Sequence, residues 1–171
     1  MPTILDGIAS NETVSVKWVA TIADTSAPKL ATEVSAATSA ALECLMTEKI
    51  SPDASVDKVS LRRACSSAVR ERNGAITRTI ADIIAVYDPQ SALIVPLNAA
   101  YSKLVPRAQG YLVIRWGKHV DTAWAVGDKV DVYPVEVGYR TKIAGADNEE
   151  LTFKAGVSIR GDVKEDVALV A

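Results

Sequence analysis

Apolar and polar residues alternate with a period of two along residues 110–159. Residues 110–117 form an apolar run bounded by two glycines, and residues 129–143 carry valine at alternate positions near their start. A period of two places neighbouring side chains on opposite faces of a strand. The pattern predicts three strands joined as an antiparallel meander. In the third strand the inward set is Leu151, Phe153, Ala155, Val157 and Ile159.

The apolar positions of the middle strand change phase at Tyr133 and Pro134. Val130 and Val132 precede the change, and the later set starts at Tyr133 itself. Proline has no N–H group to donate, so within sheets it is found at edges or bulges. We expect an edge or a bulge here, where the strand bends between two sheets. The later inward set is Tyr133, Val135, Val137 and Tyr139.

The N-terminal part of the chain predicts an arm, a strand and a less regular segment. Residues 1–12 mix proline, glycine and polar residues, which is typical of an irregular N-terminal arm. Residues 13–22 alternate and predict a strand with one face on a core. In residues 29–46 the apolar positions are three and four apart, but poor helix formers are frequent. We interpret this segment as a short helical turn near 31–36 followed by a strand over 40–46.

Residues 47–73 are predicted to form a long loop, which is polar over 47–57. Residues 58–66 could form a strand within it, with Val59, Leu61 and Ala64 facing inward. The dipeptide Asn73-Gly74 near the end of the loop is a strong hairpin signal, because both residue types tolerate positive φ. We expect this turn to join a strand over 68–72 to a second strand over 75–86. Threonines and an aspartate interrupt the isoleucines of the second strand, so a bulge or bend is expected there.

One helix is predicted after Asp88. Asp88 is suited to cap a helix, and Pro89 is suited to its first position. Pro96 lacks the N–H of an interior hydrogen bond, so the helix kinks at Pro96 or begins there. Its buried face is predicted to carry Leu93, Leu97, Ala100, Tyr101 and Leu104.

The last segment, residues 160–171, is either a final strand or an arm that pairs elsewhere, with the C-terminal arm beginning at about residue 162. Strands at this spacing with a single helix predict a mainly β fold, an antiparallel β-sandwich or partly open barrel flanked by one α-helix. A chain of 171 residues suits one domain that spans residues 1–171.

Composition narrows the function classes. The chain is 49% apolar with 5% aromatic residues, and 19 basic against 21 acidic residues give a net charge of −2. This balance argues against a dedicated nucleic-acid binder, which carries a large positive excess. The two cysteines, Cys44 and Cys65, are interpreted as reduced thiols in the core. No apolar run approaches the ~20 residues that span a bilayer, and no leader pattern is present, so we expect a soluble intracellular product without a membrane partner.

The sequence contains no constellation typical of catalysis or metal binding. His119 is the only histidine, and we interpret it as a solvated loop residue because no orienting partner is evident. One histidine and two distant cysteines give no metal-ligand spacing. Asp128, Asp131 and Glu136 lie on or beside one strand and are interpreted as outward-facing, solvated carboxylates. We therefore predict no catalytic, cofactor or metal site, and no enzyme.

Charge is segregated along the chain. Basic residues gather in 58–78, where Glu71 is the only acid, and acidic residues gather in 147–166. Such a chain can stack head to tail, with a basic surface on an acidic one. A solvated hairpin and a nucleic-acid patch are the alternatives, and the lack of aromatic residues between Leu61 and Ala85 weakens the second. The candidate contacts between stacked copies are Lys58, Arg62, Arg63, Arg70, Arg72, Glu165 and Asp166.

Several segments share the order of elements and the short phrases of one known family. They are 1–8, 21–28, 86–90, 100–101, 110–117 and 124–135, with Trp18 in the first strand and the closing strand with its arm. In these segments the chain resembles the major tail (tail tube) proteins of long-tailed, non-contractile phages that infect actinobacteria. The resemblance extends over nearly the whole chain, and residues 48–73 depart most from the family pattern.

This resemblance implies a β-sandwich or barrel with a flanking helix and no enzymatic activity. Six copies would form a ring, and rings would stack helically into the tube through which the genome leaves the virion. DNA would pass through the lumen without specific binding. The implied partners are further copies of the chain, the tape-measure protein, and the tail-terminator and distal tail proteins.

The implied location is the virion tail, assembled in the host cytoplasm. Two alternatives remain open from the sequence. The first is a tail-terminator or head–tail connector ring protein, which would also be part of the virion but at a different position in it. The second belongs to a different class, a small β-barrel ligand-binding module or enzyme.

Overall fold

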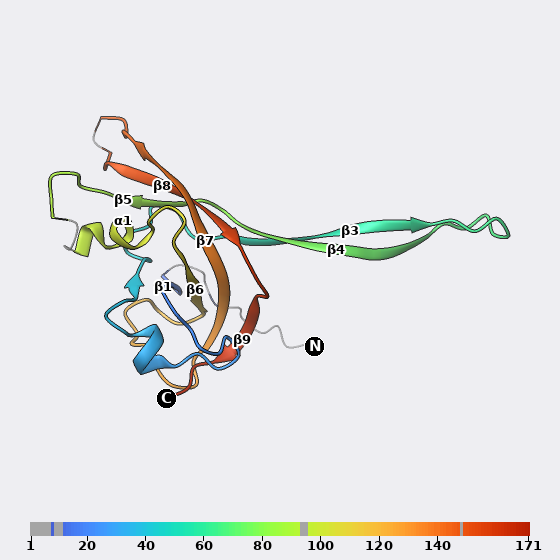
Figure 1. The fold of residues 1–171 in the computed structure, drawn as a ribbon, viewed down its shortest axis with the longest axis horizontal. Coiled ribbons are helices and arrows are strands. Elements are labelled where there is room, and N and C mark those ends of the chain that lie inside the picture. The colour runs from blue at the N-terminus through green and yellow to red at the C-terminus, as the bar shows by residue number, and fades with distance from the viewer. Residues whose placement is uncertain (1–7, 9–11, 93–95, 148) are drawn as a thin grey trace, which may run out of the picture.

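The computed structural model describes residues 8, 12–92, 96–147 and 149–171. The body is one curled antiparallel sheet, a half-barrel, from which a two-stranded hairpin projects (Figure 1). The predicted mainly β class with one small helix is confirmed. The sheet has the order β2-β1-β6-β7-β8-β5, and β9 also pairs with β7. The sheet strands are β1 (Val14–Val19), β2 (Ala40–Ala41), β5 (Ile83–Val86), β6 (Gln109–Trp116), β7 (Lys129–Ile143), β8 (Thr152–Ile159) and β9 (Lys164–Ala168). The hairpin strands are β3 (Pro52–Leu61) and β4 (Arg70–Ile80), and the helical elements are a π-helix (Leu30–Val34), a 3-10 turn (Pro96–Asn98) and α1 (Ala99–Lys103).

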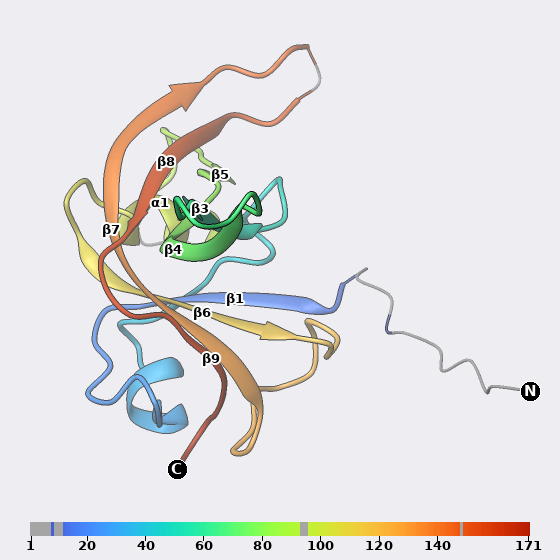
Figure 2. The ribbon, with the colours of Figure 1, turned by 90° about the vertical axis from the view of Figure 1, so that its right-hand side faces the viewer.

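The meander predicted from the period-two pattern is confirmed. β6, β7 and β8 are successive neighbours in the sheet, and both pairs are antiparallel. β7 pairs with β6 from Val130 to Glu136, and with β8 from Val135 to Ile143. β7 therefore joins the two halves of the curled sheet, as its long arc shows in Figure 2.

Apolar side chains pack on both faces of the sheet, in two clusters. On β6, Leu112 belongs to the larger cluster and Val113 to the smaller one, because neighbouring side chains point to opposite faces. On β7, Val132 packs in the smaller cluster and Tyr133 in the larger one. The predicted change of phase is thus confirmed from Tyr133 to Val137, and its cause is a change of the covered face. Tyr139, also expected to face inward, is exposed.

Of the two forms expected at Pro134, an edge or a bulge, the structure has the edge, because the pairing of β7 with β6 runs through this position without a shift. The edge expected there is present on the opposite side of β7. Pro134 lies between Val132, the last residue paired with β9, and Val135, the first paired with β8. Its carbonyl on that side accepts from the backbone N–H of Arg160 at 2.9 Å. Pro134, which has no N–H to donate, therefore lies where the partner of β7 changes from β9 to β8. No hydrogen bond between strands is lost there.

The segment after β1 contains the two expected kinds of element, a helical turn and a strand, but the strand is shorter than expected. The π-helix Leu30–Val34 and the two-residue β2 replace the expected helical turn and the longer expected strand. Val34 is fully buried in the smaller cluster, and Ala40 is buried in the larger one. This segment therefore crosses from one face of the sheet to the other.

The helix begins at Pro96 and not at Asp88, which settles the choice left open by the proline. Asp88 accepts from the Gln90 backbone N–H at 2.9 Å and from the Ser91 hydroxyl at 2.5 Å, so it closes a turn instead of capping a helix. The side chain of Asn98 bonds the backbone N–H and carbonyl of Asp88. The predicted buried position Leu93 lies outside the described residues, while Ala100 and Leu104 are buried as predicted. Tyr101 is partly buried, and the prediction for Leu97 was wrong, because its side chain is 41% exposed.

The long loop expected over residues 47–73 was wrong. β3 and β4 pair along most of this segment, from Pro52 opposite Ile80 to Leu61 opposite Arg70. The expected turn at Asn73-Gly74 was also wrong, because Asn73 pairs with Lys58 inside β4, beside an irregularity in the ladder. Long pairing overrides the local turn signal, and residues 62–69 make the connection instead.

The C-terminal segment takes the first of the two forms expected for it, a final strand. β9 pairs with β7, and the Val170 carbonyl then accepts from the Leu30 backbone N–H at 2.9 Å. Leu169 is buried in the smaller cluster. This end of the chain is therefore tied into the body of the subunit. The expected N-terminal arm lies outside the described residues apart from Ile8 and Glu12.

Candidate assembly surfaces

The hairpin of β3 and β4 stands away from the half-barrel with both faces in solvent (Figure 1). Every residue of β3 after Pro52 is exposed, and in β4 only Ile80 is buried. A two-stranded ribbon of this kind is marginally stable alone in water, and strand edges without partners are templates for pairing with another chain. The geometry therefore gives the subunit an element that is suited to contact another molecule.

The basic candidates all lie on this hairpin. Lys58 is in β3, Arg70 and Arg72 are in β4, and Arg62 and Arg63 are in the connection at the tip. Lys58 forms an exposed ion pair with Glu71 at 3.3 Å. Among the described residues, no ion pair is found for the four arginines. The tip is therefore a concentrated patch of positive charge.

Large apolar side chains accompany this charge. Five of them on the hairpin have exposed fractions between 43% and 64%, although such residues stabilise a fold chiefly when buried. These five side chains are Val56, Val59, Leu61, Val69 and Ile76. The sequence singled out Val59 and Leu61 as inward side chains of a possible strand over 58–66. That strand overlaps β3, but the inward direction was wrong, because both side chains are exposed.

The acidic candidates lie elsewhere, in β9. Glu165 forms an ion pair with Arg78 at the base of the hairpin. Asp166 has a φ of 54°, and its backbone N–H donates to Asp131 at 2.9 Å. The structure therefore keeps the acidic pair apart from the basic tip within one subunit, and Arg78, which was not among the candidates, is the residue that meets Glu165.

A buried ion pair lies beneath the loop that joins β6 to β7, and the sequence did not predict it. The guanidinium of Arg115, fully buried, lies 3.0 Å from the carboxylate of Asp128. The same guanidinium donates to the backbone carbonyls of His119, Thr122 and Ala123 at 2.7–3.3 Å. Arg115 therefore fixes this loop to the strand from which the loop departs.

The interpretation of Asp128 as a solvated carboxylate was wrong. Burial acts to raise the pKa of Asp128, but hydrogen bonds from Lys118, Arg115 and the Ala125 backbone N–H outweigh it, so the pKa lies below its ordinary value. Asp131 and Glu136 are partly exposed, as surface carboxylates are. The signal that the sequence offered was a single arginine inside an apolar strand, four residues before His119.

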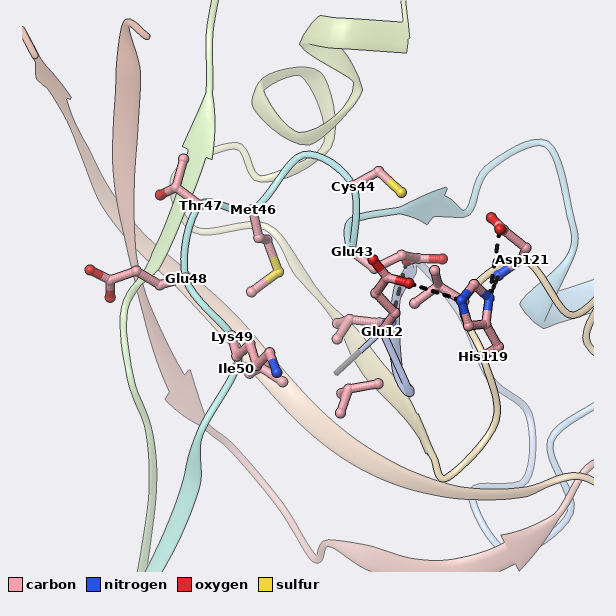
Figure 3. A pocket seen from close by; sticks show the side chains of 13 residues that line it. Glu12, Glu43, Cys44, Met46, Thr47, Glu48, Lys49, Ile50, His119 and Asp121 are labelled. Carbon is pink, nitrogen blue, oxygen red and sulfur yellow. Dashed lines mark hydrogen bonds and ion pairs between the residues drawn. The ribbon is translucent and has the colours of Figure 1, made fainter. Parts of the chain in front are cut away.

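A pocket of about 480 Å³ opens beside the loop that leads into β3 (Figure 3). Its apolar lining comes from β1 and from residues 46–50, and its charged lining from Glu12, Glu43, Glu48, Lys49 and Asp121. In Figure 3, Glu12 and Glu43 lie toward the His119 end of the pocket and Glu48 toward the other.

His119 lies in a loop with its side chain about half exposed, as expected, but it has partners. Its ring lies 3.0 Å from Glu12 and 3.6 Å from Asp121. The imidazole therefore lies between two carboxylates, one on the chain ahead of β1 and one two residues further along its own loop. The arrangement ties the chain ahead of β1 to the β6–β7 loop, and the Val120 backbone N–H reinforces it by donating to the Glu12 carbonyl at 2.8 Å.

The prediction that both cysteines are core thiols was wrong. Cys44 lines the pocket, Cys65 lies in the connection at the hairpin tip, and both are exposed. In the part of the chain that the structure describes, no three His, Cys, Asp or Glu side chains form a metal-binding group. A search of the same residues finds no helix long and apolar enough to cross a membrane.

The described chain is a β-rich protein, a curled antiparallel half-barrel with a projecting hairpin, and comparison with known proteins gives its family. A family model described as phage tail tube protein matches residues 1–171, so the chain belongs to the phage tail tube protein family. A chain in the "Cryo-EM structure of the anti-feeding prophage (AFP) baseplate, 6-fold symmetrised" is similar in fold, with a TM-score of 0.55 and 9% identity. The match covers 94% of this chain and 96% of that one. No curated protein matches. Family membership makes this a phage tail structural protein.

Proposed function

We infer that this protein is the subunit of the tail tube of a long-tailed, non-contractile phage of an actinobacterial host. Six copies form a ring, and rings stack helically into a conduit for genome delivery. The observation that carries this inference is the hairpin, which exposes arginines and large apolar side chains that have no partner among the described residues. Family membership gives that hairpin its context.

The separation of basic and acidic surfaces favours a heterologous contact between copies. Arg62 and Arg63 lie at one end of the molecule, and Glu165 and Asp166 lie on the body. A contact between two different patches either closes into a ring or continues as an open helix, and a tube made of rings uses both kinds of contact. The prophage baseplate that contains the similar chain is 6-fold symmetrised, which supports six as the ring number.

The net charge of −2 is suited to a conduit. A protein surface that neutralises many phosphates binds DNA tightly, and such binding would hold the genome in the lumen. We expect DNA to pass without specific binding, with the tape-measure protein inside the growing tube and the tail-terminator and distal tail proteins at its two ends. Assembly takes place in the host cytoplasm, and the product is part of the virion.

The test is charge reversal at the hairpin tip. The double variant Arg62→Glu with Arg63→Glu is expected to shorten or abolish tubes seen by negative-stain microscopy, while the midpoint of thermal unfolding of the dispersed subunit stays within a few degrees. Both side chains are exposed, and exposed substitutions away from special features change stability by about 0.5 kcal/mol or less. Reversal of two exposed lysines on the body, Lys29→Glu with Lys129→Glu, is the matched control.

Unchanged tube length in the hairpin variant would count against the proposed role of the tip. Electron microscopy of the concentrated wild-type protein distinguishes the tube subunit from the alternative virion role. Long tubes support a tube subunit, and single rings support a tail-terminator or connector protein. A cofactor that remains with the purified protein would instead favour the ligand-binding module or enzyme.

A further inference from the structure

The tip of the hairpin combines positive charge with apolar surface. Residues 62–69 connect the strands, and Arg62 and Arg63 lie in this connection, with Arg70 directly after it. Leu61 precedes the connection and Val69 is its last residue, and both side chains are about half exposed. A surface of this composition fits a partner that offers carboxylates around an apolar floor, because arginine binds carboxylates through two parallel hydrogen bonds.

The pocket beside β1 has the complementary composition. Four carboxylates line it against one lysine and the single histidine. Its apolar floor is formed by Val14, Val16, Met46 and Ile50. The ion pairs described for Glu12 and Asp121 are with His119, and Glu43 accepts from the backbone N–H groups of Val16 and Leu42.

The tip of a subunit cannot reach the pocket of the same subunit. The pocket residue Ile50 comes two residues before Pro52, where β3 begins, so the pocket lies at the root of the hairpin. The ten residues of β3 then carry the tip away by roughly 30 Å at about 3.3 Å per residue. Figure 1 shows the hairpin extended away from the body.

We propose that the hairpin tip of one copy docks in this pocket of a second copy. The arginines at the tip meet the carboxylates of the pocket, and Leu61 and Val69 pack on its apolar floor. This inference rests on the proposed self-assembly and specifies which surfaces meet. The pocket thereby replaces the Glu165–Asp166 patch as the acidic surface that receives the tip, because Glu165 already pairs with Arg78 at the root of the hairpin.

The two exposed cysteines fall on the two proposed surfaces. Cys44 lines the pocket, and Cys65 lies in the connection at the tip. Within one subunit the length of β3 keeps them far apart. In the docked pair, Cys44 of one copy lies beside Cys65 of the next, so the native thiols report the contact without any added residue.

The experiment is thiol cross-linking of assembled protein with a short bismaleimide, followed by denaturing gel electrophoresis. The wild-type assembly is expected to give a ladder of covalent oligomers, since each copy has one thiol on each surface. Cys44→Ser and Cys65→Ser are each expected to abolish the ladder while assemblies still form. Assemblies without cross-links would overturn this inference and leave the proposed function standing. A lack of any self-association by light scattering would overturn both. Cross-linking that persists in the Cys44→Ser variant would also overturn the inference, because it would place two tips together.

Charge exchange gives a second test that uses no cysteine. Asp121→Arg and Arg70→Glu are each expected to raise the protein concentration needed for assembly by about tenfold or more, as expected for close charge pairs at interfaces. The variant that carries both substitutions is expected to recover most of this loss, because opposite charges again face each other. Glu150→Arg, an exposed reversal outside the pocket, is the control. A double variant that assembles no better than the weaker single variant, or single variants that behave like the control, would overturn the proposal.

Discussion

Replacing Asp128 with asparagine tests whether the buried ion pair holds the β6–β7 loop. The change keeps the size of the side chain and removes the charge that faces Arg115 at 3.0 Å. Only 1% of the Arg115 side chain and 3% of the Asp128 side chain are exposed, so solvent cannot replace the lost partner. Breaking a buried pair by removing one partner costs about 3–5 kcal/mol. Arg115 keeps four neutral acceptors, so we expect about 3 kcal/mol.

Lys118 provides the matched comparison. It also pairs with Asp128, at 2.5 Å, but half of its side chain is exposed. Exposed and half-exposed pairs contribute up to about 1 kcal/mol because water screens them. Lys118→Ala is therefore expected to cost much less than Asp128→Asn, although both remove one partner of the same carboxylate.

Urea denaturation of the dispersed subunit, followed by tryptophan fluorescence, measures both variants. Trp124 is a suitable reporter, because its ring lies 4.9 Å from the guanidinium carbon of Arg115. A loss below about 1 kcal/mol in Asp128→Asn, equal to that of Lys118→Ala, would refute the reasoning.

Acid titration adds an independent check on the same group. The pKa of Asp128 is lowered on folding, so its contribution to stability is present above its unfolded pKa of about 3.9 and is lost as the pH falls through the lower folded value. The difference in stability between wild type and Asp128→Asn should therefore shrink at acid pH. A difference that stayed constant through this range would exclude ionised Asp128 as its source.

Three further predictions concern the larger cluster and its edges. Phe153→Ala should lower the free energy of unfolding by about 3–5 kcal/mol in urea titrations, because the ring is fully buried and stands edge-on to Tyr101 at 5.0 Å. Gly110→Ala should cost about 1–3 kcal/mol in the same assay, since its Cβ would lie 2.6 Å from a ring carbon of Trp18. Burial, then Asp131, raises the pKa of Tyr133 to about 12, so stability from its neutral form is present below about pH 10 and is lost as the pH rises to about 12. Alkaline denaturation of a phenylalanine variant at that position should be flatter in this range, and an unchanged profile would contradict the assignment.

The meander could be predicted because burial leaves a period in the sequence. Leu112, Phe153 and Ala155 lie on a covered face with polar or oppositely directed neighbours, and this alternation is what a strand pattern detects. The change of phase at Tyr133 was visible for the same reason. The pattern did not reveal the cause of this change of phase. A switch between two covered faces and a bulge both shift the apolar positions by one residue, so they produce the same sequence pattern.

The hairpin could not be predicted from a burial pattern, because β3 and β4 bury almost nothing within the subunit. Neither face of the hairpin is uniformly apolar or uniformly charged, so the exposed valines, leucine and isoleucine show no clear alternation. The Asn73-Gly74 dipeptide in addition suggested a turn in the wrong place. In the structure, Gly74 lies at the irregularity of the ladder, where a Cβ would approach the Asp57 carbonyl oxygen to 3.1 Å. Close approach of the two strands, and not a turn, explains the glycine.

The buried ion pair connects the stability of the body to the proposed pocket. The Arg115 guanidinium bonds the carbonyls of His119 and Thr122, which bracket Asp121, and Asp121 lines the pocket. His119 in turn holds Glu12 at 3.0 Å. The positions of two of the four pocket carboxylates, Glu12 and Asp121, therefore depend on the buried charge of Arg115. An exposed loop without this anchor would have to be ordered at each contact, which weakens association. The cost of burying Arg115 is offset by these contacts within the chain, and under the proposed docking the benefit is a receiving surface that is ordered before a second copy binds.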